Sequence, residues 1–273
     1  DKTVIGAKEV EFLGFMISGE GIRRSPKKLA AIKKFKKLKS VSDVRSFLGT
    51  ANYLKKFIPN YAEKVKPLTA MTGKHAVFQW NSEAKKAMDT VIKDLESGLC
   101  LEFPRADAEL HLYTDASLCG IGGMLVQFDK SNTERENPGV IEFMSKTLSA
   151  QEQRQTTTER DALAVFYCIC KCEFHLRGRK FVVHTDHKNL KWIQNTKSAK
   201  VERWRTYLSD FDFELEYVPG KKNIVADTLS RIGHREVKVK TGEVVKEQSN
   251  SEVDADVLEW RPAHVEARAA PLE

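Results

Sequence analysis

Residues 110–117 read LHLYTDAS, in which apolar and polar side chains alternate up to an acid at Asp115. A period of two is typical of a β-strand with one buried face. A second run, FVVHT at residues 181–185, is rich in β-branched residues and is followed directly by Asp186. The ends of strands are the usual place for site residues in α/β sheets. The two runs therefore predict an α/β fold with Asp115 and Asp186 as candidate site residues.

A third acid, Glu159, precedes an apolar stripe. Leu163, Phe166 and Cys170 follow it at i+4, i+7 and i+11, the spacing of one face of a helix. Glu159 continues this stripe, and a carboxylate on a buried face must be paired, protonated or bound to a cation. The threonines at 156–158 offer a different role for Glu159, in a helix cap.

A fourth acid, Asp227, lies in a predicted short helix over residues 222–231. An ordinary surface pair with Arg231 at i+4 is the alternative for this residue. Taken together, carboxylates from two strands and two helices would form an oxygen cage that suits Mg²⁺ or Mn²⁺ better than zinc. The candidate catalytic and metal-binding residues are Asp115, Glu159, Asp186 and Asp227.

The sequences around these acids resemble the ribonuclease H domain of Ty3/gypsy-type retrotransposon polymerases. The matching segments are TDAS at 114–117 with GIGG at 120–123, TTER at 157–160 with LAV at 163–165, TDHKNL at 185–190 and ADTLSR at 226–231. Four upstream segments are similar to the end of the palm, the thumb and the connecting region of such a reverse transcriptase: EFLGF at 11–15, RSFLGTANY at 45–53, KFIPN at 56–60 and FQW at 78–80. The resemblance covers roughly residues 1–231.

This resemblance implies a five-stranded mixed sheet flanked by helices, in the order β-β-β-α-β-α-β-α, preceded by a mainly helical region. The expected boundaries are the end of the palm at 1–20, thumb and connection at 21–107, ribonuclease H domain at 108–231, and a linker or disordered tail at 232–273. We expect the four acids to bind two Mg²⁺ or Mn²⁺ ions and to cleave the RNA strand of an RNA–DNA hybrid. The Tyr-x-Asp-Asp motif of a polymerase palm is absent from the sequence, so we expect this C-terminal part of a polymerase to make no DNA alone.

The resemblance also implies partners and a location. The partners would be the RNA–DNA hybrid, the template-primer duplex and the rest of a Pol polyprotein, including its palm, fingers and integrase. The location would be the cytoplasm, within virus-like particles. We find no secretion signal and no membrane-spanning run in the sequence.

The charge pattern agrees with a polyanionic partner. The net charge is +7 and the pI is about 9.0, and residues 21–42 contain nine basic residues and no acid. Ser25-Pro26 predicts the start of a helix there, although a solvated lysine-rich face or a membrane-surface helix would show the same charges. The candidate nucleic-acid-binding residues are Arg23, Arg24, Lys27, Lys28, Lys33, Lys34 and Lys37, with Ser117, His187 and Lys188 beside the acids.

Further helices are predicted from about Ser42 and from Asn81 or Ser82. Five cysteines without a CxxC pair indicate reduced thiols. Cys168, Cys170 and Cys172 could suggest zinc, but on one helix Cys170 points away from the other two.

Two other functions remain open. One is a nucleic-acid-binding remnant without catalysis, in a decayed or host-adopted element. The other is a different enzyme of the same fold, such as a DDE transposase or an exonuclease. The loop at 219–223 lacks the histidine that cellular and retroviral relatives place near the fourth carboxylate, and His187 is the alternative for that role.

Overall fold

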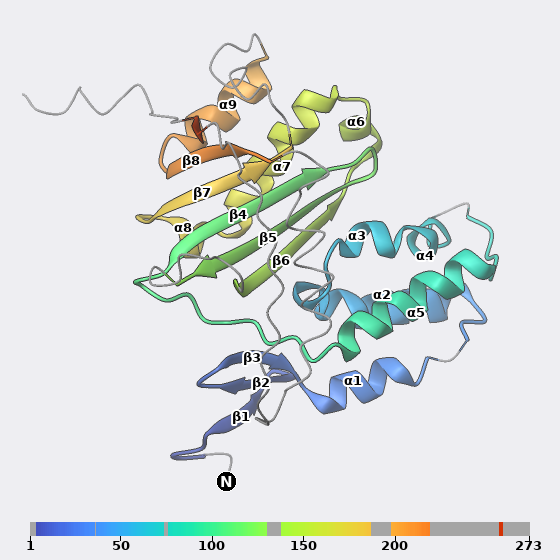
Figure 1. Cartoon of the computed structure of the whole chain (residues 1–273). Coiled ribbons are helices and arrows are strands. Elements are labelled where there is room, and N and C mark those ends of the chain that lie inside the picture. The colour runs from blue at the N-terminus through green and yellow to red at the C-terminus, as the bar shows by residue number, and fades with distance from the viewer. Residues whose placement is uncertain are drawn as a thin grey trace, which may run out of the picture.

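The computed structural model describes residues 4–35, 37–73, 76–129, 138–186, 198–218 and the short strand at 257–258. A small antiparallel sheet and a group of helices come first in the chain, and a larger mixed sheet with its own helices follows (Figure 1). Within these ranges, no helix is both long and apolar enough to cross a membrane.

The small sheet is a meander of β1 (Glu9–Phe12), β2 (Phe15–Ser18) and β3 (Gly21–Arg24). The basic segment then forms α1 (Pro26–Lys33), and the hydroxyl of Ser25 accepts a hydrogen bond from the Lys27 backbone N–H. This is the predicted N-cap followed by proline at the first helical position. Ile32 is fully buried on the apolar side of α1.

The two further helices predicted in this part of the chain are α2 (Val41–Tyr53) and α5 (Ser82–Glu96). Between them lie three short elements that the sequence did not predict, η1 (Lys55–Phe57), α3 (Tyr61–Lys64) and α4 (Lys66–Ala70). All contribute to one apolar core, in which Phe47, Phe57 and Leu68 are fully or almost fully buried.

The larger sheet has the order β6-β5-β4-β7-β8-β9. Its strands are β4 (Glu109–Ala116), β5 (Gly120–Phe128), β6 (Gly139–Thr147), β7 (Lys180–Thr185), β8 (Asp212–Tyr217) and β9 (Val257–Leu258). The pairs β4–β7 and β7–β8 are parallel and the others are antiparallel. The predicted five-stranded mixed sheet is therefore confirmed, and β9 is an unpredicted sixth strand at one edge.

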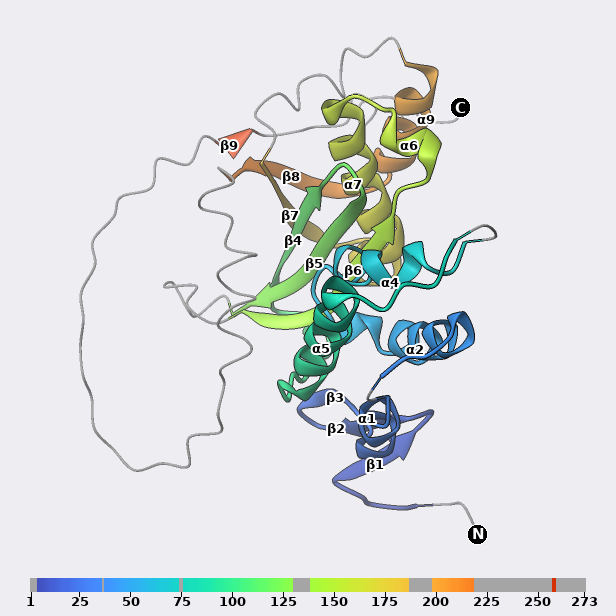
Figure 2. The same cartoon turned by 90° about the vertical axis from the view of Figure 1, so that its right-hand side faces the viewer.

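The helices of the larger sheet are α6 (Ala150–Gln153), α7 (Thr157–Lys171), α8 (Glu173–Leu176) and α9 (Ala199–Leu208). Helix α7 packs along β4 and β5, close to their backbones (Figure 2). A Cβ atom on Gly123 would lie only 2.5 Å from the Cys168 Sγ. Leu112 and Leu125 belong to the core on this face of the sheet.

The opposite face packs against the helical region, where Tyr113 and Met124 join the first core. Elements η1 and α3 contact β6, and the Ala62 backbone N–H donates to Ser145 Oγ at 2.7 Å. The sheet thus carries a core on each face, and its β5–β6 edge rests on the helical region.

Two predictions fall outside the described residues. These are the helix over 222–231 and, apart from residues 257–258, the linker or tail at 232–273. The domain boundaries given above remain predictions.

Candidate functional site

Two of the predicted acids lie side by side at one end of the larger sheet. Asp115 is the second-last residue of β4, and Asp186 directly follows the last residue of β7. These strands are parallel neighbours, and their pairing ends with Tyr113 opposite His184. Asp115 and Asp186 each follow two residues later, so both side chains project from the face opposite α7. Both are exposed to solvent.

The charges of these two acids interact. The surrounding protein removes part of the water around Asp115, which raises the pKa of its carboxyl group, and the neighbouring Asp186 raises it further. A hydrogen bond from the Ala116 backbone acts in the opposite direction, and Glu63 adds a second negative charge. Because a neighbouring carboxylate raises the pKa of Asp115, a bound cation would stabilise the charged form of this group.

The helical region reaches this site through the loop before α3. Asn60 has left-handed backbone angles, with φ 48° and ψ 38°. A small cavity beside it is lined by Asn60, Glu63, Asp115, Ser117, Gly122 and Ser145. The sequence did not indicate Asn60 or Glu63 as site residues, since no local pattern shows that residues 60–63 meet residues 115–122.

Glu159 has a different environment from the one its spacing predicted. Its carboxylate accepts hydrogen bonds from the Thr156 backbone N–H at 3.0 Å and the Thr156 hydroxyl at 3.1 Å. The Glu159 N–H donates in return to Thr156 Oγ1 at 3.2 Å, which completes a capping box. Glu159 is only half-buried, as are Phe166 and Cys170. The prediction that Glu159 continues a buried stripe is wrong, because the buried face of α7 is centred elsewhere.

The carboxylate on the buried face of α7 belongs to Asp161, which is 5% exposed. From it the stripe continues through Ala164, Val165 and Cys168, each no more than 1% exposed. Counting back from Cys168 in steps of three or four residues would have identified Asp161 in the sequence.

The topology places Asp161 along the sheet. Because β6 runs parallel to β4, helix α7 begins near the end of the sheet where Asp115 and Asp186 lie.

The donor chemistry at this end of the sheet suits a hard divalent cation. Carboxylate oxygens are the ligands that Mg²⁺ and Mn²⁺ prefer, and Asp115 and Asp186 supply them from two neighbouring strands. Within the described ranges, no three His, Cys, Asp or Glu side chains come close enough together to hold an ion. Asp227, the predicted fourth ligand, lies outside those ranges, as do His187 and Lys188.

Ser117 lies in the turn between β4 and β5. Its Oγ accepts hydrogen bonds from the backbone N–H groups of Cys119 and Gly120, at 3.2 and 3.0 Å. The hydroxyl therefore shapes the loop next to Asp115.

The basic residues of the N-terminal region differ in how far they are neutralised. Acids from other segments pair with three of them: Glu9 and Glu20 with Arg23, Glu11 with Lys27, and Glu96 with Lys33. The guanidinium of Arg24 is partly buried, which lowers its pKa. Lys28 lies over the ring of Tyr53. In the part of the chain that the structure describes, Lys34 and Lys37 have no carboxylate partner.

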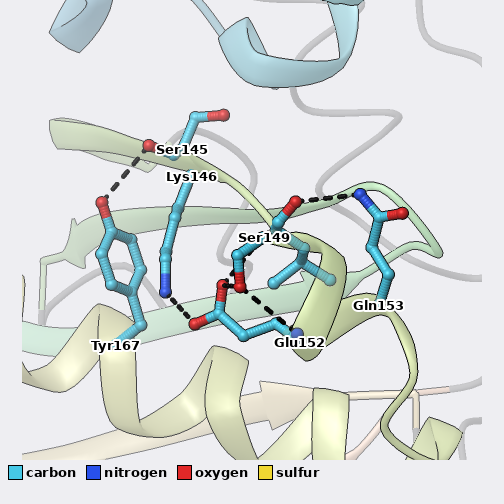
Figure 3. Close-up of polar contacts among 7 residues, drawn as sticks. Ser145, Lys146, Ser149, Glu152, Gln153 and Tyr167 are labelled. Carbon is cyan, nitrogen blue, oxygen red and sulfur yellow. Dashed lines mark hydrogen bonds and ion pairs between the residues drawn. The ribbon is translucent and has the colours of Figure 1, made fainter.

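A larger cavity of about 480 Å³ separates α2–α4 from β6 and α7. Ser145, Lys146 and Tyr167 line one wall, and the Tyr167 hydroxyl donates to the Ser145 carbonyl at 3.3 Å. Lys146 Nζ lies 2.5 Å from Glu152 Oε1, and the Glu152 carboxylate also caps α6 through Ser149 (Figure 3). The ammonium group of Lys146 is therefore neutralised by a neighbour.

Comparisons with known proteins agree with this topology. Residues 105–211 match the model of the RNase H-like domain found in reverse transcriptase. Over 239 residues the chain is 34% identical to the retrovirus-related Pol polyprotein from transposon 297 of Drosophila melanogaster, covering 85% of this chain and 21% of that protein. It is 36% identical over 238 residues to the corresponding polyprotein from transposon opus of the same organism, covering 82% and 23%.

The chain matches a fragment of a retrotransposon Pol polyprotein. It spans about a fifth of the length of the relatives that it matches. Among solved structures, the foamy viral protease-reverse transcriptase in complex with RNA/DNA hybrid has a TM-score of 0.63 at 20% identity, covering 90% of this chain and 32% of that one. This likeness concerns the fold, and it confirms the RNase H-like architecture of the Pol fragment.

Proposed function

We propose that this Pol fragment hydrolyses the RNA strand of RNA–DNA hybrids, as the ribonuclease H part of a reverse transcriptase. The observation that carries the proposal is the placement of Asp115 and Asp186 at adjacent ends of two parallel strands, where the charge of Asp186 contributes to the raised pKa of Asp115. Membership of the RNase H-like domain family supports the same activity. The products would be an RNA 3′-hydroxyl and a 5′-phosphate.

In this proposal the acids act as ligands for two Mg²⁺ or Mn²⁺ ions. Asp115 and Asp186 would hold them from the strands, and Asp227 would complete the set. A carboxylate from α7 would add a further ligand, either Glu159 or Asp161. Bound ions of this kind polarise a scissile phosphate and activate water.

The two acids of α7 differ in where they lie on the helix. Glu159 is half-buried and accepts hydrogen bonds from Thr156. Asp161 lies on the buried side of the helix, near the end of the sheet that carries Asp115 and Asp186. We therefore favour Asp161, which would reach the two aspartates past the ends of the strands, because they project from the other face of the sheet.

Binding of the hybrid would depend on the basic N-terminal helix. We propose that Lys34, Lys37 and the other basic residues near α1 contact backbone phosphates, while Ser117, His187 and Lys188 contact the strand near the acids. A solved relative of the same fold is described in complex with an RNA/DNA hybrid, which supports this partner. The remaining parts of a Pol polyprotein would be further partners, in the cytoplasm or a virus-like particle.

The test is cleavage of an RNA strand labelled at its 5′ end, within an RNA–DNA hybrid, in Mg²⁺, Mn²⁺ or EDTA. The variants are Asp115→Asn, Asp186→Asn, Glu159→Gln and Asp161→Asn, with Glu83→Gln as a control on the distant helix α5. We expect metal-dependent cutting that Asp115→Asn and Asp186→Asn abolish and that Glu83→Gln leaves intact. A larger loss of cleavage in Asp161→Asn than in Glu159→Gln would support the choice of Asp161 over Glu159.

The contrary results are equally specific. Tight binding of the hybrid by a folded wild-type chain, without cutting in either metal, would overturn the nuclease and favour a binding remnant. Cutting of double-stranded DNA in preference to the hybrid would favour another enzyme of this fold.

A further inference from the structure

A pair of buried histidines joins the two strands that carry Asp115 and Asp186. His111 lies in β4 and His184 in β7, and they are 0% and 5% exposed. The Nδ1 atom of His111 is 2.7 Å from the Nε2 atom of His184, a hydrogen-bond distance between the two rings. The rings are also nearly parallel, with centroids 5.0 Å apart and an interplanar angle of 12°.

Carboxylates lie at both outer ends of this pair. Glu109 Oε1 is 3.2 Å from the Nε2 atom of His111. Glu216 Oε2 is 3.2 Å from the Nδ1 atom of His184. A line of four polar groups therefore crosses three neighbouring strands, β4, β7 and β8.

Aromatic rings limit how far the histidines can turn. Tyr113 stacks on His184 with centroids 4.2 Å apart and an interplanar angle of 12°. The ring of Phe128, from β5, meets His111 edge-on at 4.7 Å. Close packing on both sides fixes the ring planes, so the contact between the two nitrogens is held in one geometry.

His184 lies at the last rung of the ladder between β4 and β7, opposite Tyr113, whereas His111 lies two rungs earlier, opposite Val182. Paired residues run from Leu110 opposite Phe181 to Tyr113 opposite His184 and end there. On the other face, the Thr114 hydroxyl donates to the His184 carbonyl at 3.3 Å. Asp186 follows His184 by two residues and shares its face of the sheet. The two strands are thus tied together immediately before the carboxylates project.

We propose that His111 and His184 are positioning residues that set the separation of Asp115 and Asp186. The proposal rests on the nuclease function given above. Apolar side chains at these places would bury surface without fixing a distance between the strands, whereas a bond between two ring nitrogens does fix one. Burying polar rings has a desolvation cost that polar neighbours offset, and here the other ring and the two carboxylates offset part of it. The His184 ring lies on the rung that precedes the two acids.

The principal test variant is the double substitution His111→Phe and His184→Phe. It keeps two stacked aromatic rings and removes the polar line. His184→Gln is the conservative variant, because the glutamine amide nitrogen can lie close to the position of the histidine Nε2 atom. Phe128→Leu is the packing control, since it loosens the same stack at the end away from the acids.

Three measurements are needed on each variant. Mn²⁺ binding without nucleic acid is followed by the loss of the free-ion EPR signal, cleavage of the hybrid gives kcat and KM, and urea unfolding reports stability. For the double variant we expect kcat to fall and the Mn²⁺ dissociation constant to rise by about tenfold or more, the size seen when groups that orient metal ligands are removed. KM should stay unchanged. His184→Gln should keep most of the wild-type kcat and Mn²⁺ affinity. Phe128→Leu should lower the stability and leave kcat and Mn²⁺ affinity unchanged.

Several results would overturn the positioning role. One is wild-type kcat and Mn²⁺ affinity in the double variant, and another is an equal loss in Phe128→Leu. If the double variant does not fold, the single variants His184→Gln and His184→Ala are compared instead. Equal losses of kcat and Mn²⁺ affinity in these two variants would contradict the positioning role. A wild-type chain that neither binds Mn²⁺ nor cleaves would overturn the nuclease function and the positioning role together, whereas cleavage that ignores these substitutions overturns the positioning role only.

Discussion

The side-chain oxygen of Asn60 fills the position that a Cβ atom would need on Gly122. Gly122 is the partner of Asp115 across the β4–β5 ladder, so the loop before α3 rests directly against the backbone that carries a predicted catalytic acid. The helical region and the candidate site are joined at this contact.

Gly122→Ala should therefore weaken both stability and cleavage. The new methyl group meets the end of a short side chain that can turn aside, so we expect a loss of about 1 kcal/mol in the free energy of unfolding, at the lower end of the overpacking range. Asn60→Gly, which tolerates the left-handed backbone, should relieve most of this loss in the double variant. Urea unfolding and hybrid cleavage measure the effect, with Gly19→Ala as the control because its Cβ would meet nothing within 4 Å. Strictly additive losses would contradict the contact.

Asp115→Asn should stabilise the metal-free protein while it abolishes cleavage. The pKa of Asp115 is raised in the folded state, so ionisation of this group costs stability as the pH rises through that pKa. At pH 7 we expect a gain of less than about 1 kcal/mol, because the carboxylate is exposed and screened by solvent. The gain in stability should vanish below the ordinary pKa of 3.8.

Mg²⁺ should stabilise only the wild type. Urea unfolding at pH 7 and pH 3, with and without Mg²⁺, checks each point, and equal stabilisation of both proteins by Mg²⁺ would argue against an ion at Asp115.

Glu152 should contribute stability that acid removes. Burial alone would raise its pKa, but hydrogen bonds from Lys146 and Ser149 lower it to about 2. A lowered folded pKa gives stability that is present above the ordinary value of 4.5 and is lost as the pH falls toward 2. We expect Glu152→Gln to be less stable than wild type by about 1 kcal/mol at pH 7, as for a lost helix cap, and equal to it near the folded pKa. Urea unfolding across this range is the measurement. The exposed residue Glu83 provides the control Glu83→Gln, and a difference that persists at low pH would contradict the prediction.

Lys34 and Lys37 should contribute to hybrid binding through phosphate contacts. Replacing either by alanine should weaken binding at low salt and reduce the slope of log Kd against log salt by about 1, as expected for one lost phosphate contact. Fluorescence anisotropy of a labelled hybrid at several salt concentrations gives the slope. Lys85→Ala on α5 changes the net charge equally, so a matching effect there would point to net charge instead of a contact.

Local periodicity explains why much of the fold was predictable. The alternation in 110–117 and the β-branched run at 181–185 each specify a strand without reference to the rest of the chain. Ser25-Pro26 likewise specified the start of α1. In each case the signal lies within one turn of helix or one strand, so the sequence contains it in full.

The burial of α7 shows where this reasoning failed. Glu159 and Asp161 are two residues apart, and both can be aligned with apolar residues at helical spacing. Which of the two stripes is buried depends on the face that α7 turns toward β4 and β5, where Gly123 admits Cys168. The capping box with Thr156 then determines the position of Glu159. Only the packed structure distinguishes these alternatives.

The sequence by itself determined the strands, the main helices, the family resemblance and the two acids at the strand ends, because these depend on patterns among neighbouring residues. The tertiary structure decided which distant groups meet: Asn60 with Gly122, His111 with His184, and Glu96 with Lys33. These contacts join residues separated by 62 to 73 positions in the chain. Their formation depends on how sheets and helices pack against one another, which no pattern within a single segment specifies.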